Sequence, residues 1–125
     1  MKKIILGSVL AIAAATSLSA NVANAASAAI CSGVNAAGNG ALVTAATDGT
    51  AFVRATFTPK CSANVHMAGE DNITYYRVGA ASAKGKLGYG GSSVGGAVSS
   101  TTGTPCTGAC TMTNATDALS AASTS

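Results

Sequence analysis

The sequence predicts a small all-β domain, an antiparallel sandwich held together by disulfides. Segments with a two-residue hydrophobic period recur every 8 to 12 residues or so, with glycine-rich or polar turns between them. The chain has four cysteines, and its hydrophobic fraction of 48% includes only five aromatic residues and no tryptophan. Small side chains bury little area each, so we expect covalent cross-links to supplement a thin core.

The N-terminus has the three parts of a cleavable secretory signal. Met1-Lys2-Lys3 is positively charged, residues 4–15 form an apolar run, and Ala23 and Ala25 supply the small residues that a signal peptidase reads. The apolar run is shorter than the roughly 20 residues of a membrane-spanning helix. We therefore expect Sec-type export to an extracellular, cell-surface location, rather than an uncut membrane anchor. Lipidation at Cys31 is disfavoured, because Ile30 stands where a small residue is needed.

The signal also defines the domains that we expect. Residues 1–25 are the signal peptide, 26–110 form a single β domain, and 111–125 form a C-terminal strand or tail. The formal net charge of +3 falls to about +1 when Lys2 and Lys3 are removed with the signal. Binding of nucleic acid requires clustered cations, and such clusters are not evident here. No membrane span is expected after signal cleavage.

The four cysteines, Cys31, Cys61, Cys106 and Cys110, all lie in the exported part. An even number of cysteines in a short secreted chain predicts two disulfides. Three pairings are open, and we favour Cys31–Cys61 with Cys106–Cys110 because these cysteines are nearest in sequence. The first bridge would close a loop of about 30 residues, and the second would clip a tight turn through Gly108.

The strands expected along the domain follow from alternation and from turn residues. Residues 41–46 precede an Asp48-Gly49 turn, which is a strong hairpin signal. Residues 50–58 alternate best of all and end at Pro59. Gly69 to Asn72 is an expected turn. The remaining expected strands are 62–68, 73–78, 84–89 and, most weakly, 94–98.

No catalytic, cofactor or metal site is predicted, and we do not expect an enzyme. His66 is the single histidine and is expected on a polar, solvent-facing side of a strand with Ser62 and Asn64. The adjacent acids Glu70 and Asp71 fall in an expected turn, where exposed carboxylates are routine. The glycines from 85 to 91 lack the following helix that a phosphate-binding loop requires.

The leader, the early Cys31, its partner about 30 residues later and the alternating Ala/Thr/Val strands resemble secreted bacterial fimbrial or pilus subunits. The resemblance implies an immunoglobulin-like or pilin-like sandwich that associates with itself into a polymer by donor-strand exchange. The donor segment would be the residues before Cys31 or the tail after Cys110, and the acceptor edge would lie between Leu87 and Val98. The chain differs from these subunits in its short segment before Cys31 and in lacking an aromatic residue near its C-terminus.

Two other functions remain open on the sequence. The first is a monomeric secreted or periplasmic module for cell adhesion or for binding a host or cell-surface ligand. Such a module should expose an aromatic patch, for instance around Tyr75, Tyr76 and Tyr89. The second is a secreted bacteriocin-like peptide, which should kill related cells.

Overall fold

A computed structural model describes residues 27–46, 48–101 and 106–124 of the chain. The expected signal peptide, residues 1–25, lies outside these ranges. The described chain is mostly antiparallel β-sheet, with one short α-helix and two disulfides, and so has the small all-β class that the sequence predicts.

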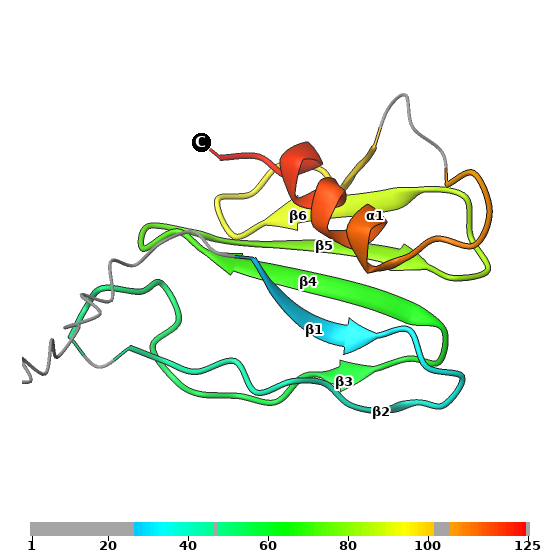
Figure 1. Ribbon diagram of the computed structural model, residues 1–125. Coiled ribbons are helices and arrows are strands. Elements are labelled where there is room, and N and C mark those ends of the chain that lie inside the picture. The colour runs from blue at the N-terminus through cyan, green and yellow to red at the C-terminus, as the bar shows by residue number, and fades with distance from the viewer. Residues whose placement is uncertain (1–26, 47, 102–105, 125) are drawn as a thin grey trace, which may run out of the picture.

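The main sheet has five antiparallel strands in the order β1-β4-β5-β6-β7 (Figure 1). Its central strands are the longest and pair along their whole length, from Val65↔Ser82 to Asp71↔Tyr76. The two edge strands are shorter, and β1 contains an irregularity between Ala29 and Cys31. The strands are β1 (Ala28–Ser32), β4 (Val65–Asp71), β5 (Tyr76–Ser82), β6 (Gly88–Ser92) and β7 (Ser99–Ser100).

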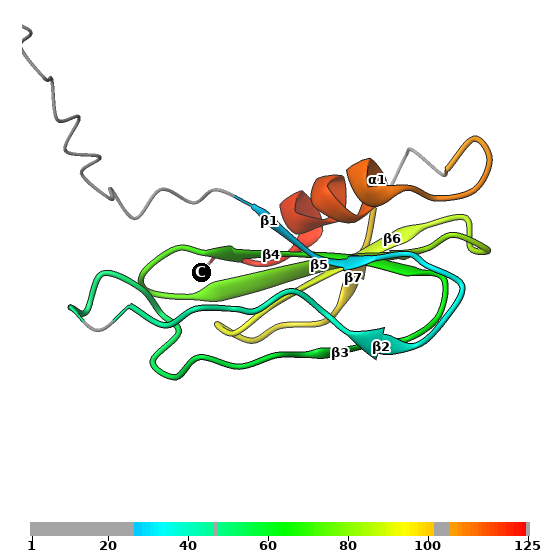
Figure 2. The ribbon, with the colours of Figure 1, turned by 60° about the horizontal axis from the view of Figure 1, so that its bottom comes forward.

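The chain between β1 and β4 forms a long, mostly irregular hairpin, which we call the arm (residues 38–61). At its base β2 (Gly38–Asn39) pairs with β3 (Lys60–Cys61), and further out Val43 and Phe57 form a single bridge. Figure 2 shows the arm below the main sheet and the helix above it. The sheet is therefore covered on its two faces by different kinds of structure.

The expected strand at 50–58 is the clearest disagreement with the sequence prediction. Only Phe57 within it takes part in a β-bridge. The backbone N–H groups of Phe52 and Val53 donate to the carboxylate of Asp71, at 2.7 and 2.9 Å, instead of to a neighbouring strand. A side chain from β4 thus satisfies donors that a ladder would otherwise use.

The C-terminal residues are helical, where we expected a strand or tail. The α-helix α1 (Met112–Asp117) continues into a 3₁₀ turn, η1 (Ala118–Ala121). The Thr111 N–H donates to Asn114 Oδ1 at 2.9 Å across the first turn, which favours a helix start at this point. Alanine, the residue with the highest helix propensity, recurs through the segment.

The helix lies very close to the sheet because glycines of β5 and β6 face it. A Cβ at Gly79 would lie 2.1 Å from the carbonyl oxygen of Ala115, and one at Gly90 would lie 2.1 Å from that of Ala118. Ala115 and Ala118 are fully buried in this contact. Each of these small residues buries little area. The backbones of the helix and the sheet lie close together, however, and this increases the van der Waals contact between them.

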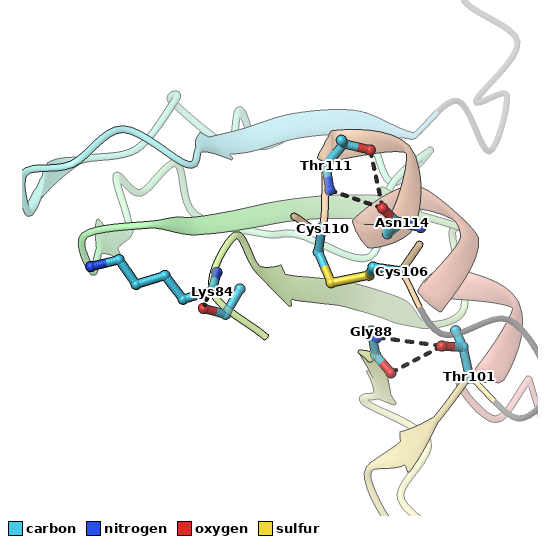
Figure 3. Close-up of a disulfide and its surroundings, with 8 residues drawn as sticks. Lys84, Gly88, Thr101, Cys106, Cys110, Thr111 and Asn114 are labelled. Atoms are coloured by element: carbon cyan, nitrogen blue, oxygen red, sulfur yellow. Dashed lines mark hydrogen bonds between the residues drawn. A yellow bond between two sulfur atoms is a disulfide. The ribbon is translucent and has the colours of Figure 1, made fainter. Parts of the chain in front are cut away.

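Both favoured disulfides are present and are confirmed by the structure. Cys31–Cys61 joins edge strand β1 to the base of the arm, with a Cα–Cα distance of 5.7 Å. Cys106–Cys110 closes the turn before α1 (Figure 3) and is buried with Ala81 and Ala115 in the core on the helix side. Figure 3 also shows Thr101 Oγ1 beside the backbone of Gly88, where it accepts from the N–H at 3.3 Å.

Several expected strands are shifted along the sequence rather than missing. The expected strand at 62–68 becomes β4 and extends to Asp71, so the turn falls at residues 72–75 instead of 69–72. The strand expected at 73–78 becomes β5, and that at 84–89 becomes β6. Asn64 has φ 61° and Ile73 has φ 67°, so the chain turns sharply at both places.

Candidate functional site

Among the described residues, an apolar groove lies between the arm and the face of the main sheet opposite the helix. It encloses about 930 Å³. Successive strand side chains point to opposite faces, so the residues of β5 and β6 that alternate with Gly79 and Gly90 form its floor. The arm forms the opposite wall. The six residues that define the groove are Phe52, Phe57, Tyr76, Val78, Tyr89 and Val98.

These apolar side chains remain accessible to solvent. Phe57 is 45% exposed, Tyr89 50% and Val98 71%. An apolar groove with a few polar groups is the usual first candidate for a binding site. The groove volume also lies within the range of about 300–1,000 Å³ that is typical of ligand pockets.

Asp71 fixes the position of the arm beside the groove. Its carboxylate accepts hydrogen bonds from the backbone N–H groups of Phe52, Val53 and Ile73, all between 2.7 and 2.9 Å. Partial burial acts to raise the pKa of Asp71, but these three hydrogen bonds and the positive charge of Arg54 hold it below its usual value. The carboxylate is thus ionised at neutral pH and attaches the arm to the end of β4.

Tyr76 forms the end of the groove near Asp71. A Cβ at Gly69 would lie 2.1 Å from its phenol oxygen, so the ring extends over the glycine of the neighbouring strand. Burial raises the pKa of the Tyr76 phenol, and the nearby Asp71 carboxylate adds to the effect. The Tyr76 hydroxyl therefore stays protonated under ordinary conditions.

Of the described residues that line the groove, Arg54 is the one that carries a charge. Its side chain is exposed and forms no ion pair within the described ranges. A Cβ at Gly49 would lie 3.6 Å from Arg54 Nη1, so the guanidinium lies by the turn at the tip of the arm. As far as the described residues line it, the groove thus has an apolar body and, at one end, a positive charge without an ion-pair partner.

The acidic pair that the sequence places in a turn lies at the end of β4 instead, and its two members do different things. Glu70 is buried and forms an ion pair with Arg77 across the β4–β5 ladder at 2.8 Å. Asn72 Nδ2 donates to the same carboxylate at 2.7 Å. Adjacent residues of a strand point to opposite faces of the sheet. Glu70 therefore stabilises the sheet on one face through Arg77, and Asp71 holds the arm on the other.

His66 is not on the polar, solvent-facing surface expected for it. It lies in β4, with its ring packed over the backbone of Gly33, where a Cβ would approach to 2.3 Å. Its Nδ1 is buried without a hydrogen-bond partner in the described part of the chain. Neither Ser62 nor Asn64 belongs to the same strand.

Within residues 27–46, 48–101 and 106–124, no group of three or more His, Cys, Asp or Glu side chains is arranged to hold a metal ion. Neither helical segment of these ranges has the length and apolar character that a bilayer crossing demands. Comparison of the chain with protein-family models, with curated proteins and with solved structures gives no match.

Sequence reasoning found part of the groove. It singled out Tyr75, Tyr76 and Tyr89 as a candidate aromatic patch, and the structure brings Tyr76 and Tyr89 together in the groove without Tyr75. It missed Phe52, Phe57 and Arg54, because an expected regular strand gave no reason to place them opposite β5. The available signal was Asp71 alone, a carboxylate that can accept hydrogen bonds from a distant segment of backbone.

Proposed function

We propose that the chain is an exported structural subunit of an extracellular, fimbria-like filament whose subunits join by strand addition. The proposal includes the immunoglobulin-like or pilin-like sandwich fold that the sequence resemblance implies. The observation that carries it is that the main sheet ends in two short edge strands on opposite sides, β1 and β7. Among the described residues, no further regular strand of the main sheet pairs with the outer side of either one. Two disulfides are compatible with an extracellular location.

The edge at β7 has backbone groups that point away from the sheet. The Thr101 N–H donates to the Gly88 carbonyl oxygen at 2.9 Å, so it points toward β6. Backbone groups alternate in direction along an antiparallel strand, and the N–H of Ser100 therefore points outward. An unpaired strand edge of this kind is a template for pairing with another chain.

The opposite edge, β1, is covered by the arm at Ile30 and Cys31, which are buried, and is exposed at Ala28, Ala29 and Ser32. The Ala41 N–H donates to the Ile30 carbonyl oxygen at 2.8 Å, and Cys31 is tied to Cys61. Pairing of β7 in one subunit with β1 in the next joins two different surfaces. Such a heterologous contact does not close on itself in general and produces a filament. The bridge at Cys31 would keep β1 in place under load.

The proposed donor segments need revision in this arrangement. Residues Ala28–Ser32 already pair with β4, and the segment after Cys110 forms α1 and η1 on the sheet. Strand addition in this protein is therefore proposed as edge-to-edge pairing between folded subunits, in preference to insertion of a free terminal segment.

Electron microscopy of material sheared from cells that produce the full chain tests the proposal. We expect regular fibres that contain the protein. The Ser100→Pro variant removes the outward N–H at the edge without removing a ladder hydrogen bond, and it should abolish the fibres. The Ser100→Ala variant keeps the N–H and should still form them. Both purified variants should give the circular dichroism spectrum of the unaltered protein.

A soluble monomer at all concentrations, with no fibres on cells, would refute this function. That result would favour the second candidate, a monomeric binding or adhesive module. The specific observation for that candidate is the accessible aromatic groove. Fibres formed by Ser100→Pro as well as by Ser100→Ala would show that the β7 edge is not the contact.

A further inference from the structure

The groove carries an inference that does not depend on filament formation, because its floor is formed by β5 and β6 and not by an edge strand. Its lining is almost entirely aromatic and aliphatic. The few polar side chains include Ser93, whose hydroxyl oxygen already accepts a hydrogen bond from the Tyr76 N–H at 2.9 Å. A carbohydrate needs many directed polar partners, and the groove does not supply them.

An extended peptide is also a poor fit for this floor. Peptides that add to a sheet use the free N–H and C=O groups of an edge. Val78 and Tyr89 are in strands whose backbone groups pair within the β5–β6 ladder. An occupant of the floor therefore contacts side chains alone and needs no backbone hydrogen bonds of its own.

The charge of Arg54 decides between the remaining occupants. A second copy seated groove to groove would bring two Arg54 guanidinium groups into one apolar interface. Asp71, which feels the charge of Arg54, already accepts three backbone hydrogen bonds and forms no ion pair with Arg54. An anionic group at the end of an apolar ligand would pair with Arg54 and leave the rest of the groove to hydrocarbon.

We propose that the groove binds one free long-chain carboxylate, a fatty-acid anion. Its aliphatic chain lies along the floor between Val78 and Tyr89, under Phe52 and Phe57 of the arm, and its carboxylate pairs with Arg54. Burial of the chain supplies the affinity, and Arg54 selects the anion. Contact with Phe52 also links the ligand to the part of the arm that Asp71 holds.

Isothermal titration calorimetry on the mature, disulfide-bonded protein tests the proposal, with decanoate below its micelle concentration as the probe. We expect saturable binding of one decanoate, with affinity rising about fourfold for each added methylene between octanoate and dodecanoate. Decan-1-ol should bind at least tenfold more weakly than decanoate. The Arg54→Gln variant should weaken decanoate binding at least tenfold and leave decan-1-ol binding unchanged.

Two matched valine substitutions locate the site. Val98 lines the groove and is 71% exposed, whereas Val34 is 58% exposed and lies outside it. Both positions are accessible, so we expect replacement by glutamate to leave the fold intact. Val98→Glu should weaken decanoate binding at least tenfold, and Val34→Glu should bind it as the unaltered protein does.

Several results would overturn the proposal. They are the absence of saturable decanoate binding, equal binding of decanoate and decan-1-ol, and equal effects of the two valine variants. Sedimentation showing a dimer that Val98→Glu dissociates would make a second copy the occupant. Co-sedimentation with anionic phospholipid vesicles, without binding of monomeric decanoate, would make a membrane surface the occupant.

Discussion

The close contact between the helix and the sheet makes a quantitative prediction for two adjacent glycines. Gly90 and Gly91 lie side by side in β6 and point to opposite faces of the sheet. A Cβ on Gly90 would lie 2.1 Å from the Ala118 carbonyl oxygen and 2.9 Å from the Ala122 nitrogen, both backbone atoms. A Cβ on Gly91 would lie 3.4 Å from a methyl carbon of Val98, which is close to an ordinary contact.

The Gly90→Ala variant must therefore push η1 away from the sheet by roughly 1 Å to restore ordinary separations. Overpacking of this kind costs about 1–3 kcal/mol of unfolding free energy. For a domain of this size, the melting temperature should fall by about 5–20 °C. Gly91→Ala needs no such movement, and the loss of chain freedom in its unfolded state should stabilise it by up to about 1 kcal/mol.

Thermal unfolding followed by circular dichroism, with both disulfides intact, measures the difference. The two variants share residue type, strand and sequence context, so their difference isolates the contact with Ala118. Equal melting temperatures for Gly90→Ala and Gly91→Ala would refute the close packing of the helix on this strand.

Three further predictions concern the arm, the long disulfide and the buried ion pair. Asp71→Asn should destabilise the arm by about 1–2 kcal/mol and speed hydrogen exchange at the Phe52 and Val53 amides. The pKa of Asp71 is lowered in the folded protein, so in the unaltered protein these amides should be protected from exchange above about pH 4. They should lose that protection as the pH falls through the folded pKa. Exchange rates independent of pH after correction for intrinsic exchange would contradict this role. Replacing Cys31 and Cys61 together by serine should lower the unfolding free energy by about 3.5 kcal/mol, measured by urea denaturation, and a loss below about 1 kcal/mol would show that the arm is constrained by other contacts. Glu70→Ala leaves Arg77 without its partner and should cost about 3 kcal/mol in the same assay, whereas Asp117→Ala, at an exposed position, should change it by less than about 0.5 kcal/mol.

The alternation of residue types correctly indicated an antiparallel all-β domain, and cysteine spacing correctly indicated both disulfides. Each of these signals is local, since alternation reports which face of one strand is buried and nearest-neighbour bridges report short loops. The same local reasoning failed at residues 50–58, where alternation is good but the backbone donors of Phe52 and Val53 bind Asp71. It also left His66 on a solvent-facing surface, because the approach of Gly33 depends on the pairing of β1 with β4.

By itself, the sequence determined the class of the domain, its covalent links and the abundance of small residues. It did not determine what those small residues accomplish, since Gly79 and Gly90 acquire their role only when the C-terminal segment folds back as a helix against them. Likewise, the groove exists because an arm of about 24 residues is anchored by one carboxylate across the face of β5 and β6. Contacts between segments far apart in the chain decide both features, and no periodicity within a segment encodes such contacts.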